Sequence, residues 1–151
     1  MKKKYNEEDE NKISQFYVGE EDPRTFAREL EQRTKRFAVT IIRLSAKLPN
    51  TIEGRIIRDQ LTKAGSSVGA NYREANRARS RADFRSKIKI CESESSETEY
   101  WLGIVIELEW MTRKESEFEI TECKELLAIF TSIGRSLDKP ANPKISNRYQ
   151  K

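Results

Sequence analysis

Hydrophobic residues recur every three or four positions along most of this chain, a spacing that places them on one face of a helix. The pattern predicts four helices, at about 24–48, 51–79, 81–112 and 121–138. The sequence has no alternating run of β-branched residues and no Asn-Gly or Asp-Gly hairpin turn, so no strand is predicted. Four amphipathic helices with short connections favour an all-α, antiparallel up-down four-helix bundle.

Local signals mark the predicted helix ends. Pro49 closes the first helix, Asn50 with Glu53 predicts an N-cap for the second, and Ser80 with Asp83 predicts one for the third. The second helix also contains a run of small residues, from Gly65 to Ala70. This run lacks the Gly-Lys-Ser/Thr ending of a phosphate-binding loop and follows no strand, so we expect it to let another helix approach closely.

The regions outside the helices are polar. Residues 1–23 carry dense charge of both signs and predict a flexible arm, and residues 139–151 predict a basic disordered tail that begins with two prolines. No apolar stretch has the length of a membrane span or the layout of a secretion signal. We therefore expect a cytoplasmic protein.

The third predicted helix carries a second stripe at three/four spacing, and Trp101, Ile104, Leu108 and Met111 form its apolar end. Two interpretations fit this stripe equally: the helix is central in the bundle, or these four residues contact another subunit. Glu94 and Glu97 interrupt the stripe. Because the first two helices supply mostly arginine and lysine, a structural ion pair with Lys87 or an arginine of the second helix is favoured over a metal site.

Composition argues against catalysis. The chain has 151 residues and no histidine, which excludes Ser-His-Asp and Cys-His nucleophile systems, histidine zinc sites and the Glu-x-x-His ligands of di-iron bundles. Cys91 and Cys123 form neither a CxxC pair nor a disulfide framework. We predict no catalytic residue, no metal and no cofactor, and hence a protein that is not an enzyme.

Charge is segregated along the sequence. Residues 24–89 hold 17 basic and 6 acidic side chains, whereas residues 90–125 hold 3 basic and 11 acidic ones. The densest basic stretch consists of Arg73, Arg77, Arg79, Arg81, Arg85, Lys87 and Lys89. These side chains are either a surface for the phosphates of RNA or DNA, read with little sequence preference, or a solvated corner whose arginines pair with nearby carboxylates. Composition alone slightly favours the second interpretation.

The middle of the chain resembles a known family. The run Gly69-Ala70-Asn71-Tyr72-Arg73-Glu74-Ala75, followed by Ala78, Ser80, Asp83, Phe84 and Lys87 and then by Glu97, Tyr100, Trp101 and Leu102, resembles the 23S ribosomal RNA intervening-sequence proteins. The run from Leu126 to Phe130 fits the last helix of that family, and the likeness covers about residues 30–138. Within it we expect a packing role for Asn71, as a buried hydrogen bond or a cap on a neighbouring helix.

The resemblance implies a four-helix bundle that assembles as a homopentameric ring, with no catalytic motif. The family is related to the accessory variability determinant of diversity-generating retroelements, a pentameric basic nucleic-acid binder. The resemblance therefore shifts the balance toward an oligomer that binds RNA or DNA through the arginine-rich corner. The alternative is a scaffolding oligomer that binds a protein partner and no nucleic acid.

Overall fold

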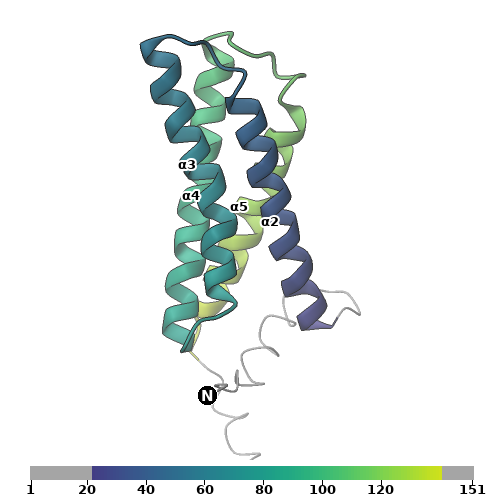
Figure 1. Cartoon of the computed structure of the whole chain (residues 1–151). Helices are drawn as coiled ribbons and strands as arrows, with labels where there is room; N and C mark the ends of the chain where they lie inside the picture. Colours follow the sequence, from purple (N-terminus) through teal and green to yellow (C-terminus); the bar gives the residue numbers. More distant parts are fainter. Residues whose placement is uncertain (1–21, 141–151) are drawn as a thin grey trace, which may run out of the picture.

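The computed structural model describes residues 22–140, and the predicted arm and tail lie almost wholly outside this range. These residues form four helices without a strand: α2 (Pro23–Ser45), α3 (Ile52–Ala75), α4 (Arg81–Glu107) and α5 (Glu117–Asp138). The chain runs up and down the long axis, so successive helices are antiparallel (Figure 1). The fold class expected from the hydrophobic spacing is confirmed for one chain.

The two middle helices begin at residues whose side chains accept a hydrogen bond from the first turn. Ser80 Oγ accepts from the Asp83 backbone N–H at 3.1 Å, as the sequence predicts. For α3 the predicted cap is wrong by one residue, because Thr51 rather than Asn50 occupies the extended position before the helix. The Thr51 hydroxyl accepts from the Gly54 N–H at 3.0 Å.

Three helices end earlier than the hydrophobic spacing predicts, and α5 begins earlier. The first ends at Ser45 rather than 48, although Leu48 is still only 3% exposed. The third ends at Glu107, and Glu109 then takes a left-handed backbone conformation, with φ of 56°. The three/four spacing of apolar residues thus indicates which residues are buried. It continues into the tight turns that follow the helices, so it overestimates helix length.

The core is formed by one face of each helix. Its largest fully buried side chains are Tyr72, Phe37, Phe130, Ile41, Leu61, Ile88, Leu102 and Leu126. The rings of Tyr72 on α3 and Phe130 on α5 lie with centroids 5.5 Å apart across the bundle. The predicted close approach at the small-residue run is confirmed: a Cβ at Gly65 would lie 2.6 Å from Ile41 Cγ2, so α2 and α3 need glycine there.

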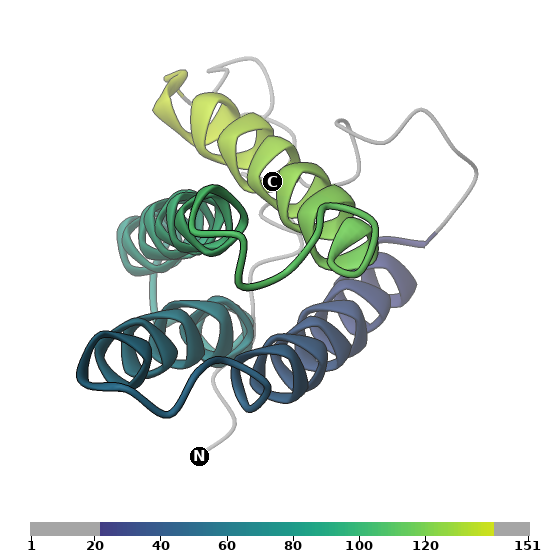
Figure 2. The same ribbon diagram turned by 90° about the horizontal axis from the view of Figure 1, so that it is seen from above.

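Each helix packs mainly on its neighbours in the chain, and the seam between α2 and α5 is the sparsest of the four (Figure 2). Arg33 bridges that seam. Its guanidinium donates to Glu122 Oε1 at 2.6 Å and Oε2 at 2.8 Å, and also to Glu125. The hydrogen bond to Glu122 raises the pKa of Arg33, so the guanidinium stays charged. The ion pairs of Arg33 therefore join α2 to α5, the neighbouring helices that pack least closely.

Candidate nucleic-acid interface

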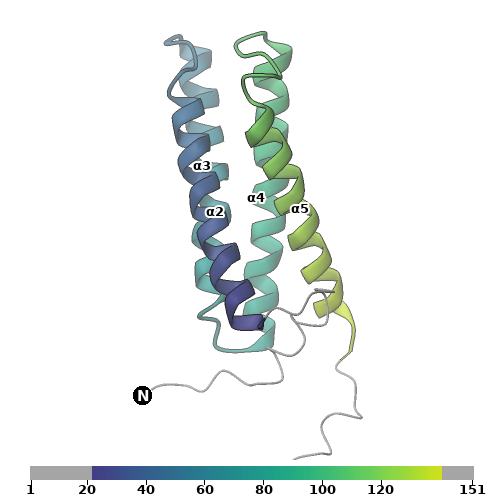
Figure 3. The same cartoon turned by 90° about the vertical axis from the view of Figure 1, so that its right-hand side faces the viewer.

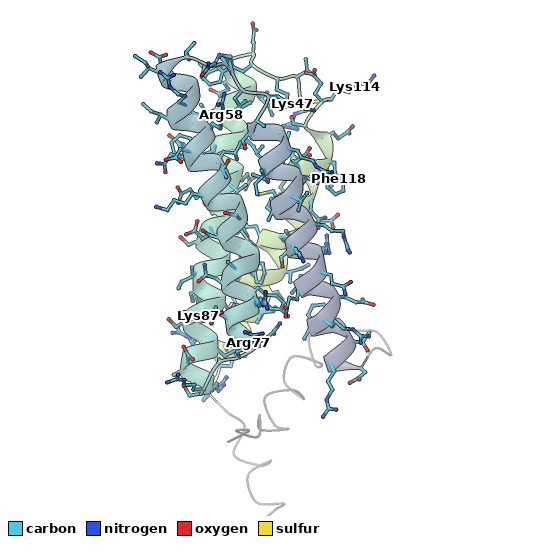
Figure 4. The ribbon with its side chains drawn as sticks, in the orientation of Figure 1. Lys47, Arg58, Arg77, Lys87, Lys114 and Phe118 are labelled. Carbon is cyan, nitrogen blue, oxygen red and sulfur yellow. The ribbon has the colours of Figure 1, made fainter. Side chains whose placement is uncertain are left out.

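The arginine-rich segment occupies one end of the bundle. It comprises the last turn of α3, the connection over residues 76–80 and the first turns of α4, with Arg77 and Lys87 labelled at the lower end in Figure 4. The Asn76 N–H donates to Tyr72 O at 3.0 Å and the Ala78 N–H to Ala75 O at 2.9 Å, so the connection is a tight continuation of α3. The backbone at this end is therefore well defined.

Three of the seven predicted cations face the C-terminus of α5, where they have partners. Arg81 donates to the carbonyl oxygens of Leu137 at 3.1 Å and Lys139 at 3.3 Å. Arg85 Nε donates to Asp138 Oδ1 at 2.6 Å. These bonds satisfy the last carbonyls of α5 and place positive charge at the negative end of its dipole. They hold α4 and α5 together.

Lys89 completes this cluster. Its Nζ lies 3.5 Å from Asp138 Oδ2 and 3.5 Å from Glu92 Oε2. Hydrogen bonding to Arg85 lowers the pKa of Asp138, and Lys89 acts in the same direction. Arg81, Arg85 and Lys89 thus form a structural cluster with the end of α5. Arg85 and Lys89 share the Asp138 carboxylate of α5, and Lys89 also pairs with Glu92 of α4.

The other four predicted cations are largely without partners. Arg77 and Arg79 are exposed, Lys87 is half-buried, and no side-chain nitrogen of the three lies within 4 Å of a carboxylate of residues 22–140. The backbone N–H of Arg79 donates to Asp83 Oδ2 at 3.0 Å. Arg73 is 59% exposed, and its nearest acidic oxygen, on Glu31, is 3.9 Å away. The predicted single corner therefore divides into a paired half and a free half.

The apolar stripe on α4 also divides. Met111 is only 8% exposed and belongs to the core of the protomer, so its predicted role in a subunit contact is wrong. The turn at the end of α4 is the reason, because it takes Met111 out of the helical register that the stripe assumes. Trp101 and Ile104 are half-buried and pack on the core, while Leu108 is 47% exposed. These three residues remain on the outside of α4.

The polar residues singled out on α3 and α4 make local contacts. Asn71 is half-buried and its Nδ2 donates to Ser67 O, one turn back on the same helix, so of the two predicted roles it forms a hydrogen bond rather than a cap on a neighbouring helix. Glu97 accepts from Trp101 Nε1 at 3.2 Å. Glu94 forms no ion pair within residues 22–140, and burial together with repulsion from Glu97 raises its pKa. The predicted ion pair with Lys87 or an arginine of α3 is therefore not formed.

The described residues offer little reactive chemistry. No three Asp, Glu or Cys side chains among residues 22–140 lie close enough together to hold a metal ion. Burial raises the pKa of both thiols, Cys91 and Cys123, to about 12, so they are protonated at neutral pH. Cys91 Sγ donates to Val68 O and Cys123 Sγ to Ser95 O, which is a packing role.

One basic surface was not singled out from the sequence. The outward side of α2 carries exposed lysines and arginines along almost its whole length. The signal was present, since the same three/four period that marks the buried face of a helix also marks the opposite face. The cations of the arginine-rich segment are close together in sequence, whereas those of α2 are separated in sequence and become neighbours only on the helix surface.

The fold and the exposed cations at the α3–α4 end define a class of protein: an all-α four-helix bundle with an exposed basic end. The family model described as 23S rRNA-intervening sequence protein matches residues 28–132, and the chain belongs to this family. A crystal structure of a protein of unknown function from the S23 ribosomal protein family of Bacteroides thetaiotaomicron VPI-5482 is similar to it, with 37% identity and a TM-score of 0.65. The match covers 70% of this chain and 97% of that chain. The chain matches none of the curated proteins.

The match gives the fold and the family, and the family resemblance suggested by Asn71, Trp101 and their neighbours is confirmed. No helix among the described residues has the length and apolar character needed to cross a membrane.

Proposed function

We propose that this chain is a non-enzymatic protein that binds RNA or DNA through phosphate contacts at the α3–α4 end of the bundle. The observation that carries the proposal is the free half of the predicted corner. The guanidinium groups of Arg77 and Arg79 are exposed and pair with no carboxylate of residues 22–140, whereas Arg81 and Arg85 nearby bond to the end of α5. A planar guanidinium that is held on a rigid helix end and not neutralised suits a phosphate oxygen pair.

The mode of binding is independent of base sequence. Arg77 and Arg79 project from the turn between two helices, and no helix or strand of the bundle is presented alone for insertion into a groove (Figure 3). Contacts of this kind neutralise phosphates and release counterions, so affinity falls steeply as salt rises. The family name refers to 23S ribosomal RNA, which makes RNA the first ligand to test.

Assembly as a homo-oligomer, with five subunits as the family resemblance implies, is part of the proposal. The outside of α4 supports it, because Tyr100 is 61% exposed and Leu108 47% exposed, and Tyr100 packs edge-on against Trp101 at 5.0 Å. Aromatic and aliphatic side chains of this kind are enriched in the centres of protein interfaces. Light scattering on the wild type and on Leu108→Glu tests this, and a monomeric wild type would contradict it.

A second candidate function rests on the same α4 surface. A scaffolding oligomer would use the apolar side chains of α4, or the acidic ones that surround them, to bind a protein partner, and it would have no affinity for nucleic acid. The exposed Tyr100–Trp101 pair favours this candidate, since tyrosine and tryptophan dominate binding energy where they become buried. The two candidates differ in one measurable property, the salt-dependent affinity for RNA.

The test is fluorescence anisotropy of labelled single-stranded RNA, duplex RNA and duplex DNA, titrated with the full chain at several salt concentrations. We expect micromolar or tighter binding with a steep slope of log K against log salt. Arg77→Glu with Arg79→Glu should weaken binding at least tenfold and reduce the slope by about two. Arg81 is left intact because it holds the end of α5.

The matched control is Lys124→Glu with Arg135→Glu, which changes the net charge equally on the exposed side of α5. It should weaken binding less than twofold. Equal losses in the two double variants would show that only net charge matters and would remove the site. No binding by the wild type even at low salt would contradict the nucleic-acid function and favour the scaffold.

A further inference from the structure

The outward side of α2 is a continuous basic surface. Five exposed cations lie on it, and we call them the α2 cationic face: Arg28, Lys35, Arg36, Arg43 and Lys47. At 3.6 residues per turn the four on the helix lie opposite Phe37 and Ile41, which are buried in the core, and Lys47 follows in the turn after α2. Glu29 is the one exposed acidic side chain of the helix.

The charges on this face form no ion pair with a carboxylate in the part of the chain that the structure describes. None of its five cations has a carboxylate of residues 22–140 within 4 Å. The acidic groups nearest to α2 are engaged along its two seams instead. On the α3 side Glu31 accepts from Asn76 Nδ2 at 3.0 Å, and on the α5 side Arg33 occupies Glu122 and Glu125. Hydrogen bonds lower the pKa of the Glu115 carboxyl and Lys47 lies near enough to lower it further, whereas the four cations on the helix keep their charge unpaired among the described residues.

Such a face destabilises the free protein slightly. Arg43 and Lys47 are four residues apart, and like charges at this spacing repel each other. A polyanion turns that repulsion into attraction at every position along the face. The face is also continuous with the free arginines of the proposed site, because the bonds of Glu31 bring the end of α3, with Arg73, beside α2. Lys47, beyond the upper end of α2, and Arg77, at the lower end of the bundle, mark the two ends of this combined basic surface in Figure 4.

The shape and chemistry of the face select a kind of nucleic acid. From Arg28 to Lys47 it extends about 28 Å, close to the roughly 34 Å of one turn of a duplex. Proteins that hold single strands place aromatic side chains among the cations so that bases can stack. The exposed apolar side chains of α2 are Val39 and Ile42, which are aliphatic, while Phe37 is turned into the core. The face therefore suits the phosphates of a rigid duplex better than the bases of a flexible single strand.

We infer that the α2 cationic face, continuous with Arg77 at the end of α3, binds the phosphate backbone of a double-stranded nucleic acid over about one helical turn. The inference rests on the proposed nucleic-acid function and adds to it a second surface and a preference for duplex over single strand. The shared ligand chemistry is a duplex phosphate backbone, which RNA and DNA both provide.

The test compares matched charge reversals in the full chain by anisotropy with a labelled RNA duplex, a DNA duplex of the same sequence and the single-stranded RNA. Arg36→Glu with Arg43→Glu reverses the middle of the α2 cationic face. Lys124→Glu with Arg135→Glu makes the same change in net charge on the exposed side of α5. We expect at least a tenfold loss of duplex affinity in the first variant and less than a twofold loss in the second, with the salt slope falling by about two only in the first.

Further arms separate the outcomes. Arg36→Lys with Arg43→Lys keeps the charge and should keep affinity within threefold, and thermal melting of each variant confirms that the bundle is folded. If Arg36→Glu with Arg43→Glu binds duplex as well as the α5 control does, the inference is overturned. If in that case Arg77→Glu with Arg79→Glu still loses affinity, the proposed function stands without the α2 cationic face. Tighter binding of single strands than of both duplexes overturns the duplex assignment. Dissociation of an oligomer in Arg36→Glu with Arg43→Glu, seen by light scattering, overturns it in favour of a subunit contact. The tighter of the two duplexes identifies the nucleic acid.

Discussion

The turn between α3 and α4 and the first turns of α4 carry the same kind of side chain but differ in what lies opposite. Arg79 in the turn is exposed; its backbone N–H donates to Asp83 Oδ2 at 3.0 Å, but its guanidinium pairs with no carboxylate of residues 22–140. Arg81, two residues later, is half-buried and donates to two carbonyls at the end of α5. Neighbouring arginines thus differ in what they contact: one group holds α4 to α5, and the other remains exposed, where we propose that it binds phosphates.

The same contrast recurs on α2. Arg33 faces the seam with α5 and is bound to Glu122 and Glu125, whereas Arg36, less than one turn away, faces solvent. The role of a basic residue in this protein therefore depends on whether its side chain faces a neighbouring helix or the solvent. The comparison of fastened and free cations predicts that the first group controls stability and the second controls binding.

The largest effect on stability is expected at the α2–α5 seam. Arg33→Met removes the bonds to Glu122, whose side chain is only 13% exposed and would be left without its counter-charge. We expect the free energy of unfolding to fall by about 2 kcal/mol. Urea denaturation followed by circular dichroism measures this. Arg36→Met is the matched control on the same helix and should change it by less than about 0.5 kcal/mol. Equal effects in the two variants would contradict the contrast on α2.

A smaller loss is expected at the end of α5. Arg81→Ala removes two charge-assisted bonds to the carbonyls of Leu137 and Lys139, while water can replace part of them because the site is half-exposed. We expect the free energy of unfolding to fall by about 1–2 kcal/mol. Arg79→Ala is the control, and its stability should lie within about 0.5 kcal/mol of the wild type. If Arg79→Ala costs as much as Arg81→Ala, the two arginines are not distinct in the way the structure describes.

The smallest effect depends on pH. Arg85 lowers the pKa of Asp138, and a carboxylate whose pKa is lowered on folding adds stability above its unfolded pKa of about 3.9. That stability is lost as pH falls from there through the folded pKa. Arg85→Ala should therefore melt at a lower temperature than the wild type at pH 7, and the gap should close below about pH 4. Thermal melting from pH 7 to pH 3 tests this, and a gap that stays constant across the range would contradict the pairing.

Much of the fold could be predicted from local pattern. Phe37, Ile41, Leu61 and Tyr72 are core residues in the structure, and the three/four spacing of apolar residues is enough to place them on the buried faces of their helices. The N-cap at Ser80 followed from a short-range rule, because a cap bonds to a residue three positions away. Met111 was misplaced because the helical register was extended past the turn at Leu108 and Glu109, where the backbone direction changes.

The site was harder to predict than the fold. The sequence offered one interpretation for all seven cations, either a phosphate surface or a corner paired with carboxylates. In the structure Arg81, Arg85 and Lys89 face α5, while Arg77 and Arg79 remain on the turn. The partner that decides this, Asp138, is more than fifty positions away from Arg85 along the chain. No local rule relates the two, because their separation depends on how α4 and α5 pack.

The sequence by itself determined the four helices, their buried faces, the excess of positive charge in the first half and the absence of histidine chemistry. These properties depend on residue type and on spacing within one helix, which the order of residues specifies directly. Only the tertiary structure decided which cations are neutralised and which remain free. An ion pair requires two groups within about 4 Å, and for Arg33 with Glu122 or Arg85 with Asp138 that distance is created by the packing of helices distant in sequence.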